Sequence, residues 1–144
     1  MGYTTKFTGC INLSRALTLK EAKELLEIAD LDRAKVREIT SIEAYLQWVP
    51  TETLDGIVWD GNEKFYEYVP LLRWLCGWLK ERGIKANGEL LWAGEETLDR
   101  GHIVVSSNEV EVIEGQRIET KSGSPLTLKR LGEIALHQAL EAIK

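Results

Sequence analysis

Two groups of acidic residues stand where carboxylates could do chemistry. The first group precedes and begins a predicted helix, and the second lies in a predicted loop between two strands. Paired carboxylates can bind a divalent cation or divide the roles of general acid and general base. The spacing matches no calcium-binding loop, and acidic residues are also common in first helical turns and solvated loops without any ligand. The candidates are Asp60, Glu63 and Glu67 in the first group and Glu95, Glu96 and Asp99 in the second.

Five tryptophans are many for a chain of this length. Trp48, Trp59 and Trp92 fall on predicted strands, where their rings could form a stacking platform for a base or a sugar. Proteins that bind single strands interleave basic residues with such aromatics, whereas the neighbours here include Asp60 and Glu95. The pattern therefore favours indoles that pack in a core or anchor a protein interface.

Few other residues could act as ligands or nucleophiles. His102 and His137 have unlike surroundings, and no serine or cysteine near His102 stands in a nucleophile motif. Cys10 and Cys76 lie in separate predicted elements without Cys-x-x-Cys spacing, which indicates two reduced core residues. Neither a Walker loop nor a dinucleotide-binding glycine loop occurs in the sequence. We therefore expect no disulfide, no bound metal and no cofactor, and we assign no catalytic residue.

The charge balance argues against nucleic acid as a partner. With 18 basic and 23 acidic residues the formal net charge is -5, so no overall positive field attracts phosphate. No apolar run approaches the ~20 residues that cross a bilayer, and the N-terminal residues do not resemble a secretion signal. We expect a cytoplasmic protein that binds neither nucleic acid nor membrane.

Hydrophobic periodicity predicts an α+β fold with a mainly antiparallel sheet of five or six strands. The spacing of Thr18 and Glu21 is that of a capping box and starts a helix over 18–30. A strong apolar repeat predicts a second helix over 67–82, with Pro70 in its first turn. Because short links force the later strands to run antiparallel, we expect a meander there. The predicted strands are 3–13, 45–49, 56–59, 89–92, 101–106 and 109–113, with a turn at 87–88.

Both long helices should cover one face of that sheet. Their apolar sides then form the core, and we expect Leu75, Trp78 and Leu79 to be buried there. A shorter helix is predicted over 32–46, because apolar residues recur there every three or four positions. Ser107 and Asn108 form a two-residue hairpin link, since asparagine tolerates the left-handed region.

The end of the chain differs from the rest. We expect residues 1–119 to form a single α+β domain and 120–144 to form a linker and an amphipathic helix. Ser124 and Pro125 provide an N-cap and a proline at the first helical position, which predicts a helix over 125–143. Its apolar arc is broader than one surface requires, so the helix is either wedged within its own chain or meets a second copy. We predict a homodimer to which this helix contributes.

Several segments resemble small uncharacterised proteins of bacteriophages and prophages. They are MGYTTKFTG, QWVPT, WDGNEKFYEYV, NGELLWAGEE and DRGHIVVSSNEVEV. The resemblance implies a viral or prophage accessory product, and it brings no assigned catalytic residue. The chain departs from the pattern at 120–144, which extends past where such proteins often stop, and at Pro70, where a helix former is more usual.

Two functions from different classes stay open. The first is a non-catalytic phage or prophage accessory protein that binds a host or phage protein through an acidic, aromatic-bearing surface, for example to inhibit a host defence. The alternative is a small enzyme or ligand-binding module with a site between the carboxylates and the tryptophans. A closed polar cleft would favour the second and an exposed aromatic patch the first. The residues predicted to bind are Trp48, Trp59, Asp60, Glu63, Trp92, Glu95, Glu96 and Asp99.

Overall fold

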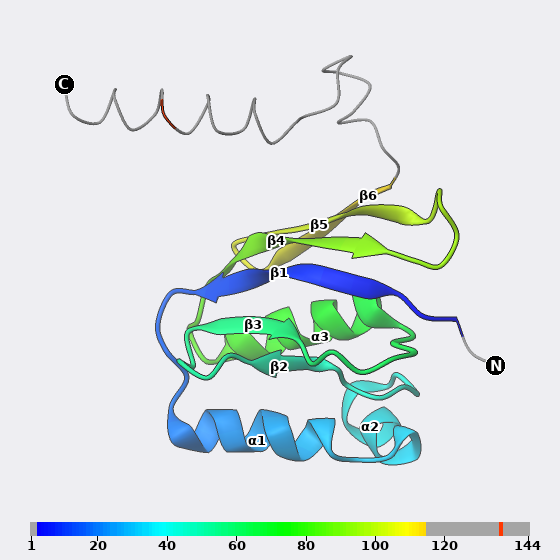
Figure 1. Ribbon diagram of the computed structural model, residues 1–144. Helices are drawn as coiled ribbons and strands as arrows, with labels where there is room; N and C mark the ends of the chain where they lie inside the picture. The colour runs from blue at the N-terminus through cyan, green and yellow to red at the C-terminus, as the bar shows by residue number, and fades with distance from the viewer. Residues whose placement is uncertain (1–2, 115–135, 137–144) are drawn as a thin grey trace.

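The computed structural model of the protein describes residues 3–114 and Leu136. The described residues form a six-stranded sheet in the order β2-β3-β1-β4-β5-β6, in which all neighbouring strands run antiparallel (Figure 1). This confirms the predicted α+β class and the antiparallel sheet. The strands are β1 (Lys6–Leu13), β2 (Trp48–Pro50), β3 (Gly56–Trp59), β4 (Ala86–Ala93), β5 (Arg100–Ser106) and β6 (Glu109–Glu114), and the helices are α1 (Leu19–Ala29), α2 (Arg33–Thr40) and α3 (Tyr68–Glu81).

The pair β1 and β4 forms the middle of the sheet. The two strands are in register from Lys6 opposite Ala93 to Leu13 opposite Ala86. Because side chains alternate along a strand, one side of this pair is apolar and buried, whereas the other side holds the more exposed residues. The buried residues of the pair include Phe7, Ile11, Leu90 and Trp92.

Helix α3 packs its apolar side on the buried face of the sheet, and Figure 1 shows it behind the strands. Leu75 and Leu79 are buried, and so is Trp78, which confirms the predicted core face of this helix. Pro70 lies in the first turn, where its missing N–H costs little. The helix begins after Glu67, which adopts a left-handed conformation with φ 58°.

Helix α1 begins with the predicted capping box. The N–H of Glu21 donates to the Thr18 hydroxyl at 3.1 Å, and the N–H of Thr18 donates to the Glu21 carboxylate at 2.9 Å. Helix α2 is shorter than the predicted helix over 32–46, which is wrong beyond residue 40. Ser41 takes the left-handed conformation with φ 67° and ends the helix.

The predicted turn at 87–88 is also wrong, because Asn87 and Gly88 lie inside β4 and pair with β1. Gly88 serves the close approach of two backbones instead of a turn. A Cβ at this position would collide with the carbonyl oxygen of Cys10. A glycine that makes room between strands looks the same in the sequence as one that makes a turn.

The predicted two-residue hairpin between β5 and β6 is confirmed. Ser107 and Asn108 have φ of 46° and 71°, the left-handed values that such a link needs. The Asn108 side-chain amide also donates to the carbonyl oxygens of Cys76 and Ile84, both at 3.0 Å. The hairpin is therefore fastened to α3 and to the segment that follows it.

Gly101 in β5 makes room for the side chain of its neighbour in β4. It pairs with Trp92, and a Cβ on Gly101 would overlap the six-membered ring of that indole. The same Cβ would also collide with the carbonyl oxygen of Ile113. The buried tryptophan thus depends on a glycine in the adjacent strand.

Several predictions concern residues outside those that the structure describes. The domain boundary at 119, the linker and most of the helix over 125–143 fall there. Leu136 is described, and it is helical and 62% exposed. Among the described helices, none has the length and apolarity to span a bilayer.

Candidate functional site

The loops that hold the two acidic groups are joined by Tyr3. Its backbone N–H donates to the hydroxyl of Tyr66 at 3.2 Å, in the loop 60–67. Its own hydroxyl donates to Asp99 at 2.6 Å and accepts from the N–H of Glu96 at 3.0 Å, in the loop 94–99. Tyr3, which precedes β1, therefore links two loops that are distant in the sequence.

Asp99 uses both of its carboxylate oxygens in hydrogen bonds within the protein. One carboxylate oxygen accepts from Tyr3, and the other accepts from the Trp92 indole N–H at 3.0 Å. The hydrogen bond to this carboxylate raises the pKa of the Tyr3 hydroxyl above its ordinary value. Both oxygens of Asp99 are thus engaged in holding the loop 94–99.

The loop 60–67 is held by its own polar contacts. The carboxylate of Asp60 accepts from the backbone and side-chain N–H groups of Asn62, at 2.8 and 2.9 Å. The Trp59 indole N–H donates to the carbonyl oxygen of Asn62 at 3.1 Å and to the Gln47 side chain at 3.2 Å. Gln47 in turn donates to the carbonyl oxygen of Glu63 at 3.3 Å. Asp60 therefore stabilises a turn, and the residue remains exposed to solvent.

The other carboxylates of these loops point to solvent. They form no ion pair with any residue of 3–114. Two exposed hydrophobic side chains accompany them, Tyr66 at 49% and Leu98 at 80%. We call this set the acidic surface; its members are Asp60, Glu63, Tyr66, Glu67, Glu95, Glu96 and Leu98.

The carboxylates of the acidic surface do not converge in the described part of the chain. Among those residues, no three His, Cys, Asp or Glu side chains gather closely enough to hold an ion. The two acidic groups that were singled out from the sequence are thus brought to neighbouring loops without converging on one point. Such separate carboxylates act through their summed field instead of through a coordination shell.

The three candidate tryptophans build the core beneath these loops. Trp48 is fully buried and donates from its indole to the carbonyl oxygen of Tyr68 at 2.8 Å. Trp92 is 6% exposed, and Trp59 is half-buried with its ring 5.6 Å from that of Phe7. Trp48 and Trp92 therefore present no open ring face to a base or a sugar.

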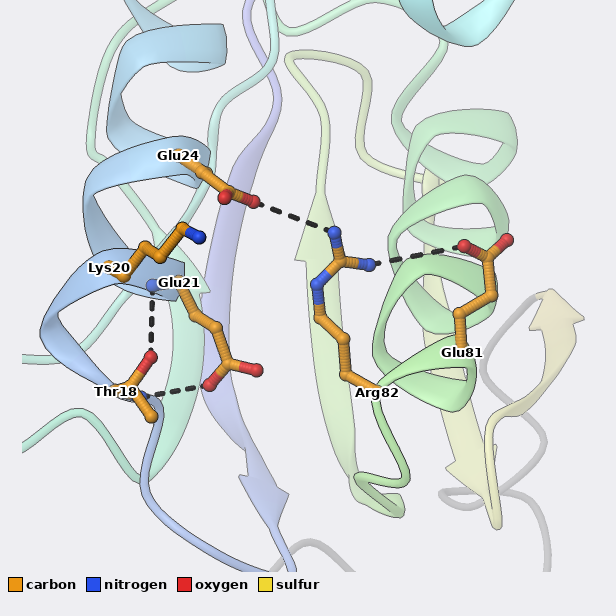
Figure 2. Close-up of a pocket in the computed structure, with 6 residues that line it drawn as sticks. All are labelled: Thr18, Lys20, Glu21, Glu24, Glu81 and Arg82. Carbon is orange, nitrogen blue, oxygen red and sulfur yellow. Dashed lines mark hydrogen bonds and ion pairs between the residues drawn. The ribbon is translucent and has the colours of Figure 1, made fainter.

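A hollow of about 500 Å³ lies between the start of α1 and the end of α3 (Figure 2). The guanidinium of Arg82 lies 3.7 Å from the centre of the Trp78 ring and 3.5 Å from the Glu24 carboxylate. It also donates to the Trp78 carbonyl oxygen at 2.8 Å. Arg82 thus connects the two helices across the hollow. The lining residues are Thr18, Lys20, Glu21, Glu24, Glu81 and Arg82.

Arg15 completes this network from the segment before α1. It contacts both carboxylate oxygens of Glu21, at 2.9 and 3.0 Å, and donates to the carbonyl oxygen of Arg82 at 3.1 Å. The Arg15 hydrogen bonds, together with the backbone N–H of Thr18, lower the pKa of Glu21 to about 2. Glu21 is therefore ionised at neutral pH and is poorly suited to act as a general base there.

Sequence reasoning missed the network, although it identified Thr18 and Glu21 as a helix cap. Arg15 and Arg82 are separated by 67 positions, and neither belongs to a periodic pattern. We call Arg15, Glu21, Glu24 and Arg82 the paired network. It offers charges that neutralise each other, and it places no nucleophile beside a base. Its contacts join the start of α1 to the end of α3.

Comparisons with protein-family models, with curated proteins and with solved structures give no match to this chain. The function is therefore argued from the molecule itself. Its acidic surface, its paired network and its sheet provide the observations.

Proposed function

We propose that this chain is a non-catalytic phage or prophage accessory protein that binds a host or phage protein in the bacterial cytoplasm. The segments MGYTTKFTG and WDGNEKFYEYV support the phage origin through their resemblance to such products. A protein of host defence is the first target class to test. The observation that carries the binding function is the set of Tyr3 hydrogen bonds, which holds two exposed loops side by side.

The acidic surface has the chemistry of a protein-binding patch. Tyrosine is a frequent anchor of interfaces, and Tyr66 and Leu98 supply apolar area that is already exposed. Carboxylates without intramolecular partners lose no ion pair when a basic surface approaches them. They also attract such a surface over several ångströms and raise its association rate. We infer a partner that carries lysine or arginine around an apolar depression.

No specific observation favours the alternative of a small enzyme or ligand-binding module. Three carboxylates that line the described hollow, those of Glu21, Glu24 and Glu81, lie within ion-pair distance of Arg15 or Arg82, and the faces of Trp48 and Trp92 are closed by the core. The enzyme alternative stays a prediction from the sequence. The binding function depends instead on the carboxylates of the acidic surface that form no ion pair within residues 3–114.

We also propose that the protein is a homodimer to which residues 125–143 contribute. Leu136 supports this, because it lies on the broad apolar arc and is helical and 62% exposed. Burial of such a surface against a second copy would remove it from water. Light scattering of the full chain tests the proposal, and a monomer at high micromolar concentration contradicts it.

Affinity capture tests the partner surface with two matched sets of variants. The full chain is used as bait in infected or lysogenic cells, and captured proteins are identified by mass spectrometry. Neutralising the acidic surface should reduce capture of the partner at least tenfold, whereas the control set should leave it unchanged. The test set is Glu63→Gln, Glu95→Gln and Glu96→Gln. The control set contains exposed residues that form no ion pair within 3–114, and it is Glu27→Gln, Glu38→Gln and Glu52→Gln.

Two outcomes would contradict this proposal. Equal capture by both sets would show that the acidic surface is not the contact. Wild-type bait that retains nothing beyond an empty matrix would count against the binding function itself.

A further inference from the structure

The face of the sheet opposite α3 carries no helix in the part of the chain that the structure describes (Figure 1). The strand register gives the neighbours on this face directly, because residues opposite each other on one side of a sheet are adjacent. We call it the open face. Its two central rows are Thr8, Leu91, His102 and Ile113, and then Cys10, Glu89, Val104 and Glu111.

An apolar strip crosses the middle of the open face. Leu91 is 42% exposed, while Val104 and Ile113 are half-buried. His102 lies between them and is engaged with Glu89, whose carboxylate is 3.1 Å from its Nδ1. The strip spans three neighbouring strands. Because no described helix lies on this face, its apolar side chains stay partly in contact with water unless another element covers them.

Charges border this strip. Glu89 and Glu111 lie in the second row, and Lys6 and Arg100 lie at the ends of β1 and β5 beside Ala93. An element that covers the strip should therefore be apolar in the middle and carry charges of both signs at its margins.

Residues 125–143 have that character. Their apolar positions cover a broad arc, and the narrow polar stripe contains Arg130, Glu133 and Glu141. A helix over this range would be about 28 Å long at 1.5 Å per residue. Strand β4, with 8 residues, is about 26 Å long at 3.3 Å per residue. The helix and the face therefore match in length.

The chain also leaves the sheet at a suitable place. The last described residue before this segment is Glu114 in β6, which is an edge strand that borders the open face. The ten positions from 115 to 124 can span up to about 33 Å when extended, so the segment can reach the face of its own chain or of a second copy. The exposure of Leu136 favours the second copy, because an apolar arc satisfied within its own chain would bury this side chain.

We propose that the open face binds residues 125–143 of a second copy, so that two chains exchange their terminal helices. This inference rests on the homodimer proposed above and assigns its contact surface. The strip of Leu91, Val104 and Ile113 receives the apolar arc that contains Leu136.

The two native cysteines provide a test in the full-length protein. Cys10 lies on the open face and is half-buried, whereas Cys76 is buried in α3. Burial raises the pKa of the Cys76 thiol to about 11, so it serves as a slow internal reference. The rate at which a maleimide labels each thiol is followed by mass spectrometry over a dilution series. We expect Cys10 to be labelled at least tenfold more slowly in the concentrated protein, with the protection lost on dilution.

Matched leucine variants sharpen the result. Leu136→Glu and Leu91→Glu should each abolish the protection of Cys10 and the dimer, because each places a carboxylate in the apolar contact. Leu98→Glu changes another exposed leucine, on the loop 94–99, and should leave both unchanged. Circular dichroism confirms that each variant is folded.

The outcomes separate this inference from the homodimer itself. A dimer in light scattering with rapid labelling of Cys10 would overturn the docking on the open face and leave the homodimer standing. A monomer with slow labelling at every dilution would place the helix on its own sheet. A monomer with rapid labelling would reject both proposals.

Discussion

The paired network and the acidic surface use the same residue type in opposite ways. In the paired network, Glu21 and Glu24 each meet a guanidinium, and the contacts join the start of α1 to the end of α3. In the acidic surface, Glu63, Glu95 and Glu96 are exposed and unpaired within the described residues. The carboxylates of one region hold the fold, and those of the other remain exposed to solvent.

Asp99 shows where the boundary between the two uses lies. It belongs by sequence to the loop of Glu95 and Glu96, yet it accepts hydrogen bonds from Tyr3 and Trp92. A carboxylate therefore becomes structural when donors from other parts of the fold reach it, irrespective of its neighbours in the sequence. Charge clusters that look uniform in a sequence can divide in this way in space.

The largest expected effect on stability lies in the core, outside both charged regions, and provides a reference for the smaller effects expected in them. Leu75→Ala should cost about 2–5 kcal/mol of unfolding free energy, because it leaves a cavity in the core under α3. Chemical denaturation measures this, and Leu98→Ala is the exposed control that should change little. A loss below about 0.5 kcal/mol for Leu75→Ala would show that the core face of α3 is misassigned.

An intermediate effect is expected from the paired network. Glu21→Gln keeps an acceptor for the cap on Thr18 but removes the charge that Arg15 contacts, so it should cost about 1 kcal/mol at neutral pH. We expect less than the full pKa shift implies, because the side chain of Arg15 is 43% exposed and screened by water.

The pH dependence of that effect has a definite sign. The pKa of Glu21 falls from 4.5 to about 2 in the folded protein, so its stabilisation is complete above about pH 4.5. It should be lost as the pH falls from 4.5 through 2. Thermal unfolding of the wild type and Glu21→Gln should therefore differ at neutral pH and converge near pH 2. A constant difference across this range would contradict the assignment.

The smallest effect on stability is expected from the acidic surface. The triple variant Glu63→Gln, Glu95→Gln and Glu96→Gln should change the unfolding free energy by less than about 0.5 kcal/mol, because exposed unpaired charges contribute little. Denaturation of this variant beside Glu21→Gln gives the comparison directly. If the triple variant is the more destabilised of the two, these carboxylates have intramolecular roles and the contrast between the regions fails.

The parts of the fold that follow from local spacing could be predicted from the sequence. The cap at Thr18, the buried side of α3 and the link at Ser107 and Asn108 each depend on residues a few positions apart. The turn expected at 87–88 failed because the role of Gly88 depends on Cys10, which belongs to a distant strand. A local signal cannot show which backbone approaches a glycine.

The candidate site shows the same difference between local signals and long-range contacts. Sequence reasoning selected the acidic residues of both loops, but the contact that joins the loops comes from Tyr3, which is 96 positions from Asp99. It also selected Trp48 and Trp92 as candidate binding residues while favouring core or interface packing for them, and both are buried. The sequence therefore indicated which residues could serve a site, whereas the direction in which each side chain points depended on long-range pairing.

Gly101 and Trp92 have a consequence for how this sequence can change over evolutionary time. A side chain at position 101 would occupy the space of the indole and would also meet the carbonyl oxygen of Ile113, so a smaller residue at position 92 would not by itself make room for it. A lineage can therefore replace the tryptophan at the cost of a cavity, but it cannot replace the glycine while β5 and β6 keep this register. We expect relatives that keep this fold to retain glycine at position 101 more strictly than tryptophan at position 92.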